Sequence, residues 1–255
     1  MLEDNIMTSG DLKKRYDTPE GKAREITLAE GLRACIIPND ELIKNLGLFL
    51  SPATLGRILF INHLYEKILT KQGVIAEFGC RYGQNLSLFM ALRGIYEPYN
   101  RLRKIIGFDT FSGFTETHEK DKQNESGDYS VPANYEESLS ELLANMEKFS
   151  PLSHLKKHEV IKGDVSETVP KYLDQNTHTI FSLCYFDLDV YNPTKDVIKA
   201  IRPRLSKGTI LAFDELNDED MPGETLAFLE EFDINNLSVL RFGPSARTSY
   251  IVLGE

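Results

Sequence analysis

The sequence predicts an α/β protein with a seven-stranded sheet, its last strand antiparallel and helices on both faces. Two observations lead to this fold class. Short apolar runs that end in glycine or acidic residues alternate with stretches of helical periodicity, an order typical of a parallel sheet. The last two apolar runs, residues 237–242 and 248–253, have no helical stretch between them, so we expect them to pair as an antiparallel hairpin.

The N-terminal part is predicted to be an arm or partial lid, residues 1–45, attached to a larger domain, residues 46–255. The first ~30 residues carry little apolar periodicity, which indicates a mobile arm. A helical pattern then covers residues 41–71. Within it, Ser51-Pro52 marks a helix start, because proline is well tolerated in the first helical turn.

In the larger domain, the spacing of apolar residues predicts each strand and helix. Strands are short apolar runs, and helices carry apolar residues three and four positions apart. The run at 180–188 is apolar almost throughout, as expected for a central strand that is covered on both faces. Residues 112–134 are polar and predict an inserted active-site loop. The expected strands are residues 74–79, 105–109, 158–164, 180–188, 209–213, 237–242 and 248–253, and the expected helices are residues 85–96, 135–149, 167–174, 194–205 and 223–232.

Composition excludes several classes of function. The chain has 255 residues, 41% of them hydrophobic and 27% charged, as in an ordinary soluble protein with one buried core. Its formal net charge of −10 argues against nucleic-acid binding, which needs a positive surface. No run approaches the ~18 apolar residues of a membrane span, and the first residues lack the apolar core of a signal peptide. The three cysteines form no C-x-x-C pair. We therefore expect a cytoplasmic protein without membrane or nucleic-acid partners.

A glycine-containing loop follows the first strand. Gly79 and Gly83 permit a tight turn, and the helix that begins near Asn85 offers free N–H groups to a ligand. Arg81 stands where a dinucleotide-binding loop has its middle glycine. Glu77 would repel a pyrophosphate, but it would accept hydrogen bonds from the ammonium group of S-adenosylmethionine (SAM). The loop therefore favours SAM over NAD, although a structural turn without a ligand would have the same pattern.

Two further strands end in polar residues that suit the same cofactor. Asp109, followed by Thr110 and Phe111, stands where an acidic residue binds ribose hydroxyls, and Gly163-Asp164 stands where a side chain meets the adenine amino group. Acidic residues are also common in turns. Acidic residues at three successive strand ends, on the edge where open α/β sheets bind ligands, favour a cofactor site.

The next two strands end in carboxylates. Asp187 and Asp189 follow one strand, and Asp214 and Glu215 follow the next. If these strands are parallel neighbours, they lie ~4.8 Å apart and their acidic ends meet at one rim. Carboxylates without histidine or cysteine suit Mg²⁺ or another divalent cation, and Asp187, Asp214 and Glu215 are the predicted ligands. A solvated acidic rim is the alternative.

Four segments together resemble the macrocin O-methyltransferase family of antibiotic-sugar methyltransferases. They are VIAEFGCRYGQNLSLF, IIGFDTFSGF, FDLDVYNPTKDVIKAIRPRLSKGTILAFDEL and PGETLAFLEEF, and the resemblance covers roughly residues 45–255. It implies a Rossmann-like class I fold, SAM and Mg²⁺ as cofactors, a sugar-containing small molecule as the hydroxyl acceptor, and a homo-oligomer, commonly a dimer.

The resemblance also implies roles for individual residues. The metal ligands carried over are Asp187, Asp214 and Glu215, and Glu215 departs from the Asp or Asn of related enzymes. The family's loop histidine, its suggested general base, is absent from residues 121–139. His118 lies earlier in that loop and is the substitute, with Asp187 as the other candidate catalytic residue.

Other readings of the sequence stay open. A catechol-type metal-dependent methyltransferase has a similar carboxylate rim, but usually carries a lysine soon after the strand-four Asp, where this chain has Val190 and Tyr191. A Rossmann-like nucleotide-binding module without catalysis is the alternative from another class. Arg241 and Arg247 in the final hairpin are candidate contacts for an anionic part of the substrate, or ordinary solvated charges.

Overall fold

The computed structural model describes residues 19–115, 117–122, 125–245 and 247–254, and its contacts divide the chain into two compact units, Met1–Leu59 and Phe60–Glu255. The first unit contains α1 (Pro19–Arg33), α2 (Asn39–Leu42), the 3₁₀ helix η1 (Ile43–Phe49) and the start of α3 (Pro52–Ile68). The helix start at Pro52 is confirmed. Helix α1 was not expected, because it has good helix formers but no apolar stripe. The predicted arm and lid stay predictions, and residues 1–18 lie outside the described part.

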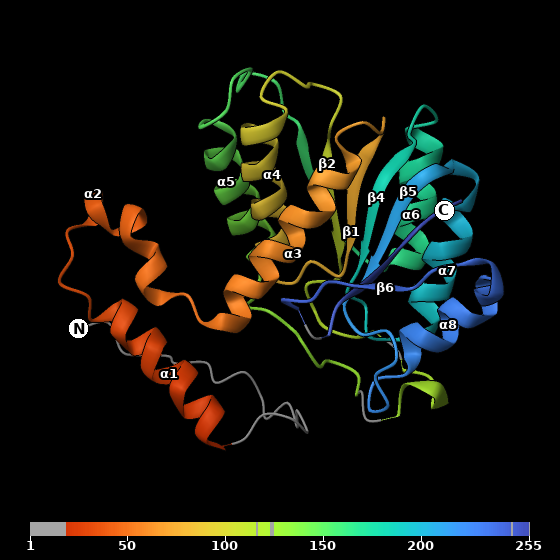
Figure 1. Ribbon diagram of the computed structural model, residues 1–255, viewed down its shortest axis with the longest axis horizontal. Coiled ribbons are helices and arrows are strands. Elements are labelled where there is room, and N and C mark those ends of the chain that lie inside the picture. Colours follow the sequence, from red (N-terminus) through yellow and green to blue (C-terminus); the bar gives the residue numbers. More distant parts are fainter. Residues whose placement is uncertain (1–18, 116, 123–124, 246, 255) are drawn as a thin grey trace. The chain divides into compact units, whose positions relative to one another are not determined.

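The second unit is built on a seven-stranded sheet of order β3-β2-β1-β4-β5-β7-β6 (Figure 1). β1 to β5 pair in parallel, whereas β7 runs antiparallel to both β5 and β6. This confirms the predicted closing hairpin and the predicted fold class. The strands are β1 (Val74–Phe78), β2 (Ile105–Asp109), β3 (His158–Lys162), β4 (Phe181–Phe186), β5 (Leu205–Phe213), β6 (Leu240–Arg241) and β7 (Ser249–Val252).

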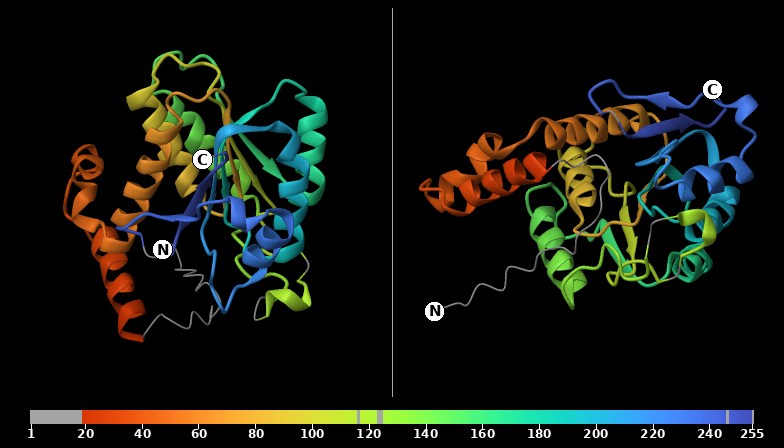
Figure 2. Two further views of the ribbon diagram at one scale, coloured as in Figure 1. Left: turned by 45° about the vertical axis from the view of Figure 1, so that its right-hand side comes forward. Right: turned by 90° about the horizontal axis from the view of Figure 1, so that it is seen from below.

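Helices cover both faces of this sheet (Figure 2). The C-terminal part of α3 packs with α4 (Gln84–Tyr96) and α5 (Tyr135–Glu147) on one face. On the other face lie α6 (Val165–Gln175), α7 (Tyr191–Ile201) and α8 (Gly223–Glu231). Helix α7 starts three residues before the predicted 194, because Pro193 fits inside the first turn rather than at the boundary. Among the described residues, no helix is long and apolar enough to cross a membrane.

A row of four phenylalanines crosses the sheet just before its carboxyl edge. Phe108, Phe78, Phe186 and Phe213 are register partners on β2, β1, β4 and β5. Their ring centroids lie 5.4, 5.1 and 4.7 Å apart along the row, and all four side chains are fully buried. This packed layer fixes the heights of the strand ends, so the loops that follow start from one rigid line.

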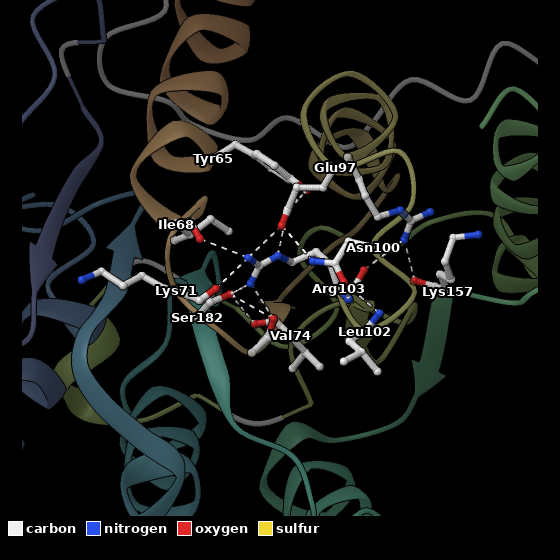
Figure 3. Close-up of polar contacts among 12 residues, drawn as sticks. Tyr65, Ile68, Lys71, Val74, Glu97, Asn100, Leu102, Arg103, Lys157 and Ser182 are labelled. Atoms are coloured by element: carbon white, nitrogen blue, oxygen red, sulfur yellow. Dashed lines mark hydrogen bonds and ion pairs between the residues drawn. The ribbon is translucent and has the colours of Figure 1, made fainter. Parts of the chain in front are cut away.

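A buried arginine holds the amino edge of the sheet, where the parallel strands begin. Arg103, with 2% of its side chain exposed, pairs through Nε with Glu97 at 2.9 Å (Figure 3). Its Nη2 donates to the carbonyl oxygens of Ile68 at 3.0 Å and Lys71 at 2.7 Å, and its Nη1 donates to Ser182 Oγ at 2.7 Å. The guanidinium thus satisfies carbonyls at the end of α3 and ties that helix to β4.

Candidate active site

The loops at the carboxyl edge begin directly above the phenylalanine row. The N–H of Gly79 donates to the carbonyl oxygen of Phe108 at 2.8 Å, that of Asp187 to Phe78 at 2.9 Å, and that of Asp214 to Phe186 at 3.1 Å. Asp109, at the end of β2, continues the same line. β4 and β5 are parallel neighbours, as the carboxylate prediction required. The predicted cofactor loop and the predicted acidic residues therefore lie side by side on one edge.

The cofactor loop approaches β4 closely. Gly79 has a φ of +83°, and a Cβ at that position would lie 1.9 Å from the carbonyl oxygen of Asp187. Only glycine fits this turn. Behind the loop, Asn85 Nδ2 donates to Glu77 Oε1 at 2.8 Å, and both side chains are buried. The loop from Glu77 to Gly83 is thereby held against the start of α4.

The acidic ends of β2 and β3 hold backbone N–H groups. Asp109 accepts from Arg81 N and from Phe111 N, each at 2.6 Å, and burial raises its pKa although these two bonds oppose the rise. Thr110 Oγ1 donates to the carbonyl oxygen of Gly113 at 2.7 Å. Asp164 caps α6 by accepting from Ser166 N at 2.8 Å, directly after Gly163. These predicted residues therefore hold the backbone of the loops at the carboxyl edge of the sheet.

Two buried polar atoms at the cofactor loop lack a protein partner. Arg81 Nε and Asn85 Oδ1 have no hydrogen bond within the described residues. Buried polar atoms are normally hydrogen-bonded, so one donor and one acceptor at this loop indicate a polar ligand or ordered water. The amino and carboxylate groups of SAM supply such partners, and the residues present therefore fit this cofactor.

Four buried carboxyl groups form what we call the carboxylate rim: Asp189, Asp214, Glu215 and Glu224. Tyr185 OH donates to Asp214 Oδ1 at 2.9 Å. Glu224 Oε1 accepts from the N–H of Leu188 at 2.9 Å.

Burial dominates the ionisation of the rim. It raises the pKa of Glu215 to about 8, with Arg247 opposing and Glu224 and Asp214 adding to the rise. Burial and the charge of Asp189 raise the pKa of Glu224 to about 8. Burial and the charges of Glu215 and Asp214 raise the pKa of Asp189 well above its ordinary value. Protons and the guanidinium of Arg247 therefore balance this group of acids.

The residues predicted to hold Mg²⁺ do not form a divalent site in the described arrangement. Arg247 Nη2 donates to Glu215 Oε1, and Asp214 is engaged by Tyr185. No group of three or more His, Cys, Asp or Glu side chains is arranged to hold a metal ion anywhere in the described ranges. Within the described residues, Glu215 Oε2 and Glu224 Oε2 are nevertheless buried without a hydrogen-bond partner, so the donor chemistry of the rim suits a cation.

The loop after β2 is anchored on the far side of the sheet by Asp121. The short 3₁₀ helix η2 (Glu119–Asp121) lies beside α8 (Figure 1). Asp121, 1% exposed, accepts from Tyr191 N at 2.7 Å and from His118 N at 2.6 Å. A Cβ on Gly223 would lie 2.5 Å from Asp121 Oδ1, so glycine is required there. The inserted loop thus reaches from β2 to α7 and α8.

His118 has a structural role in this anchor. Its Nδ1 accepts from Lys120 N at 3.2 Å, and its ring packs on that of Tyr191 with centroids 5.2 Å apart. These contacts cap η2 and place the ring against α7. The geometry supports a cap better than the general base predicted from the sequence.

Tyr129 joins the inserted loop to the cofactor loop. Its ring lies 5.0 Å from the guanidinium carbon of Arg81, which also lies 5.0 Å from the ring of Tyr82. Burial raises the pKa of the Tyr129 phenol, and the charges of Asp189 and Glu215 raise it further. The phenol therefore stays protonated beside the carboxylate rim, where it donates rather than accepts a proton.

Three residues of the site were missed by the sequence reasoning. Asp121 and Tyr129 lie in a polar loop without periodicity, where no pattern singles out one residue. Glu224 lies in the first turn of α8, where acidic residues are common. Its position in the sequence therefore did not indicate that its side chain is buried. Arg241 lies on the exposed edge strand β6, and its predicted role stays a prediction.

Comparison with solved structures gives two that match nearly the whole chain. One is described as CalS11, a calicheamicin methyltransferase, with 40% identity, 94% of this chain and 95% of that chain covered, and a TM-score of 0.91. The other is the apo form of CalS11, described as a TDP-rhamnose 3'-O-methyltransferase of calicheamicin biosynthesis, with 39% identity, 94% and 97% coverage, and a TM-score of 0.84.

A third structure, the O-methyltransferase NovP, is 16% identical over 77% of this chain and 79% of that chain, with a TM-score of 0.55, and it supports the fold alone. No family model and no curated protein matches the chain.

Proposed function

The chain belongs to the family of antibiotic-sugar O-methyltransferases that includes CalS11, and from this premise we propose that it methylates a hydroxyl of a deoxysugar carried on a nucleoside diphosphate, with SAM as the methyl donor. The observation that carries the proposal is 40% identity over 94% of the chain to an enzyme described as a methyltransferase of TDP-rhamnose. SAM, when bound, supplies a methyl group on a sulfonium sulfur, and the C–S bond breaks as the new O–C bond forms.

In this proposal the chain's main task is alignment, because the methyl group is already activated. The loop from Glu77 to Gly83 would bind the methionine part of SAM, and Asp109 would bind the ribose hydroxyls. Arg81 and Asn85 support this assignment through their unpartnered buried atoms. Thr110 and Phe111 follow Asp109 in the cofactor site, and Gly163 and Asp164 would form its adenine end.

Asp187 is the proposed general base. It is half-buried, follows β4 directly, and contacts the cofactor loop at Gly79. As the methyl group moves, the acceptor hydroxyl would lose its proton to this carboxylate. The inserted loop, residues 112–134, would exclude water, held at two interior positions by Asp121 and Tyr129. The family resemblance also implied Mg²⁺, which the carboxylates of Asp187, Asp214 and Glu215 would hold, and which would lower the pKa of the acceptor hydroxyl.

Calorimetric titration with SAM, combined with product analysis, tests the proposal. We expect the wild type to bind SAM and to methylate a nucleotide-linked deoxysugar in preference to the free sugar or a catechol. Gly79→Ala should weaken SAM binding, because the added Cβ displaces the loop from β4. Methylation of a catechol in preference to every nucleotide sugar would favour the catechol-type alternative.

A further inference from the structure

We propose that two buried carboxylates, Glu224 of α8 and Asp121 of the inserted loop, are positioning residues that hold Asp187 in place for proton transfer. The inference rests on the proposed O-methyltransferase function, in which Asp187 is the general base. It concerns the turn from Asp187 to Tyr191, which joins β4 to α7 and which we call the base turn.

The base turn has a backbone conformation that depends on its surroundings. Asp189 has a φ of +61°, in the left-handed region that residues other than glycine adopt rarely, although aspartate tolerates it better than most. Such a conformation persists where neighbouring contacts determine it, and it occurs most often at functional sites. The residues on both sides of Asp189, Leu188 and Val190, are buried. The contacts that hold the turn therefore come from the rest of the protein.

Glu224 holds the start of the base turn. Its Oε1 accepts from the N–H of Leu188 at 2.9 Å and, at the longer distance of 3.4 Å, from the N–H of Asp189, and its side chain is fully buried. These two N–H groups belong to the residues that directly follow Asp187. A carboxyl oxygen that accepts from them therefore fixes the backbone next to the proposed base.

Asp121 holds the end of the same turn. Its Oδ1 accepts from the N–H of Tyr191 at 2.7 Å. Gly223, the first residue of α8, lies against both partners, because a Cβ there would lie 2.5 Å from Asp121 Oδ1 and 2.8 Å from the carbonyl oxygen of Asp189. The base turn is thus fixed at both ends and packed against α8 between them, so it cannot shift without losing one of these contacts.

Glu224 holds the turn at a cost in stability. Its second oxygen, Oε2, is buried without a hydrogen-bond partner in the part of the chain that the structure describes. A buried polar atom without a partner lowers the free energy of unfolding. Residues that lower stability in this way are typical of functional sites, where alignment matters more than stability.

The proposed chemistry needs such alignment. The proton of the acceptor hydroxyl passes to Asp187 while the methyl carbon passes from sulfur to oxygen, and a general base must lie within hydrogen-bond reach of the proton that it takes. A displacement of ~1 Å can reduce the rate about 100-fold. Glu224 and Asp121 act on this step through the backbone of the base turn, so they should affect the rate of transfer more than the binding of either substrate.

Steady-state kinetics of Glu224 variants test the inference. Glu224→Leu removes both acceptor contacts and should lower kcat with a nucleotide-linked deoxysugar about 10- to 100-fold, while the KM for that sugar and the Kd for SAM change less than about threefold. Glu224→Gln keeps Oε1 as an acceptor and should keep kcat within about threefold of the wild-type value. The matched control is Glu231→Leu on the same helix, whose carboxylate pairs with Arg202 at 3.0 Å, and it should leave kcat unchanged.

Amide hydrogen exchange gives a readout that does not depend on turnover. The Leu188 amide should exchange about tenfold faster or more in Glu224→Leu, and at the wild-type rate in Glu224→Gln. If Glu224→Leu does not fold, Asp121→Ala takes its place in both measurements, with exchange followed at the Tyr191 amide and Asp128→Ala as the control.

Three results would overturn the inference. An equal fall of kcat in Glu224→Gln and Glu224→Leu would show that the second oxygen, and not the hold on the base turn, carries the effect. The second is an unchanged kcat in Glu224→Leu, and the third is a loss of rate that weaker binding of SAM or sugar explains entirely. An enzyme that methylates no nucleotide sugar would refute the proposed function instead, and unchanged exchange at Leu188 in Glu224→Leu would still show that Glu224 does not hold the turn.

Discussion

Replacing Asp121 by alanine should release the inserted loop from α7 without unfolding the sheet. The carboxylate accepts two backbone N–H groups, from Tyr191 at 2.7 Å and His118 at 2.6 Å, in a site that is 1% exposed. A hydrogen bond to a charged group contributes roughly 1.5–3 kcal/mol, so the two together contribute about 3–6 kcal/mol to docking of the loop. The N–H of Tyr191 belongs to the first turn of α7, where no helix carbonyl can accept it.

Amide hydrogen exchange measures this loss directly. In Asp121→Ala the Tyr191 amide should exchange about 100-fold faster or more, since ~1.4 kcal/mol corresponds to a factor of ten. Amides of β4 should keep their rates. Asp121→Asn should lie between, because its amide nitrogen cannot accept a hydrogen bond.

Asp128→Ala is the matched control for this experiment. Its carboxylate lies in the same loop and accepts a local N–H, from Glu125 at 3.0 Å. The control should leave the Tyr191 amide unchanged. Unchanged exchange in Asp121→Ala itself would refute the account of the anchor.

Three further predictions concern stability, pH and cofactor affinity. Arg103→Met should lower the free energy of unfolding by about 3–5 kcal/mol in a urea titration, because it removes the guanidinium that pairs with Glu97 and donates to several carbonyl oxygens. The control Arg101→Met, at an exposed position, should change the free energy of unfolding by less than ~0.5 kcal/mol. Glu224→Gln should stabilise the protein increasingly as the pH rises from ~4.3 to the folded pKa of about 8, reaching on the order of 5 kcal/mol, and a constant difference across that range would contradict the raised pKa. Tyr129→Ala should raise the Kd for SAM about 3- to 10-fold while Tyr129→Phe keeps it, since the ring on Arg81 and not the hydroxyl makes the contact, and equal effects would refute this.

The sign of the Glu224 prediction follows from proton linkage. The folded state holds its proton up to a pH of about 8, whereas the unfolded chain releases it near ~4.3. Between these values the folded protein binds more protons, so its stability falls as the pH rises. Glutamine cannot ionise, and the variant escapes this loss while its Oε1 still accepts from Leu188 N.

Much of the fold could be predicted because it depends on regular patterns. Apolar runs that end at Gly79, Asp109, Asp187 and Asp214 placed four loops on one edge, and parallel pairing in register brought them together. The hairpin of β6 and β7 followed from the missing helix between two apolar runs. These elements depend on the spacing of apolar residues along the chain, which can be read from a single sequence.

The rest of the site depends on contacts between residues far apart in the sequence. Nothing near His118 shows that its Nδ1 accepts a backbone N–H, nor that Asp121 meets Tyr191, 70 positions later. Likewise, the acidic pair Asp214-Glu215 looks the same in sequence whether a metal or Arg247 balances it. Long polar loops carry these contacts, and their conformation is set by the surfaces on which they dock.

The central claim is that this chain transfers a methyl group from SAM to a nucleotide-linked deoxysugar, and mass spectrometry of TDP-rhamnose incubated with the enzyme and isotope-labelled SAM tests it most directly. The account predicts a nucleotide sugar that has gained one labelled methyl group, formed together with S-adenosylhomocysteine and lost in Asp187→Asn. If SAM binds but neither TDP-rhamnose nor any related nucleotide-linked deoxysugar gains the label, the proposed acceptor class is wrong.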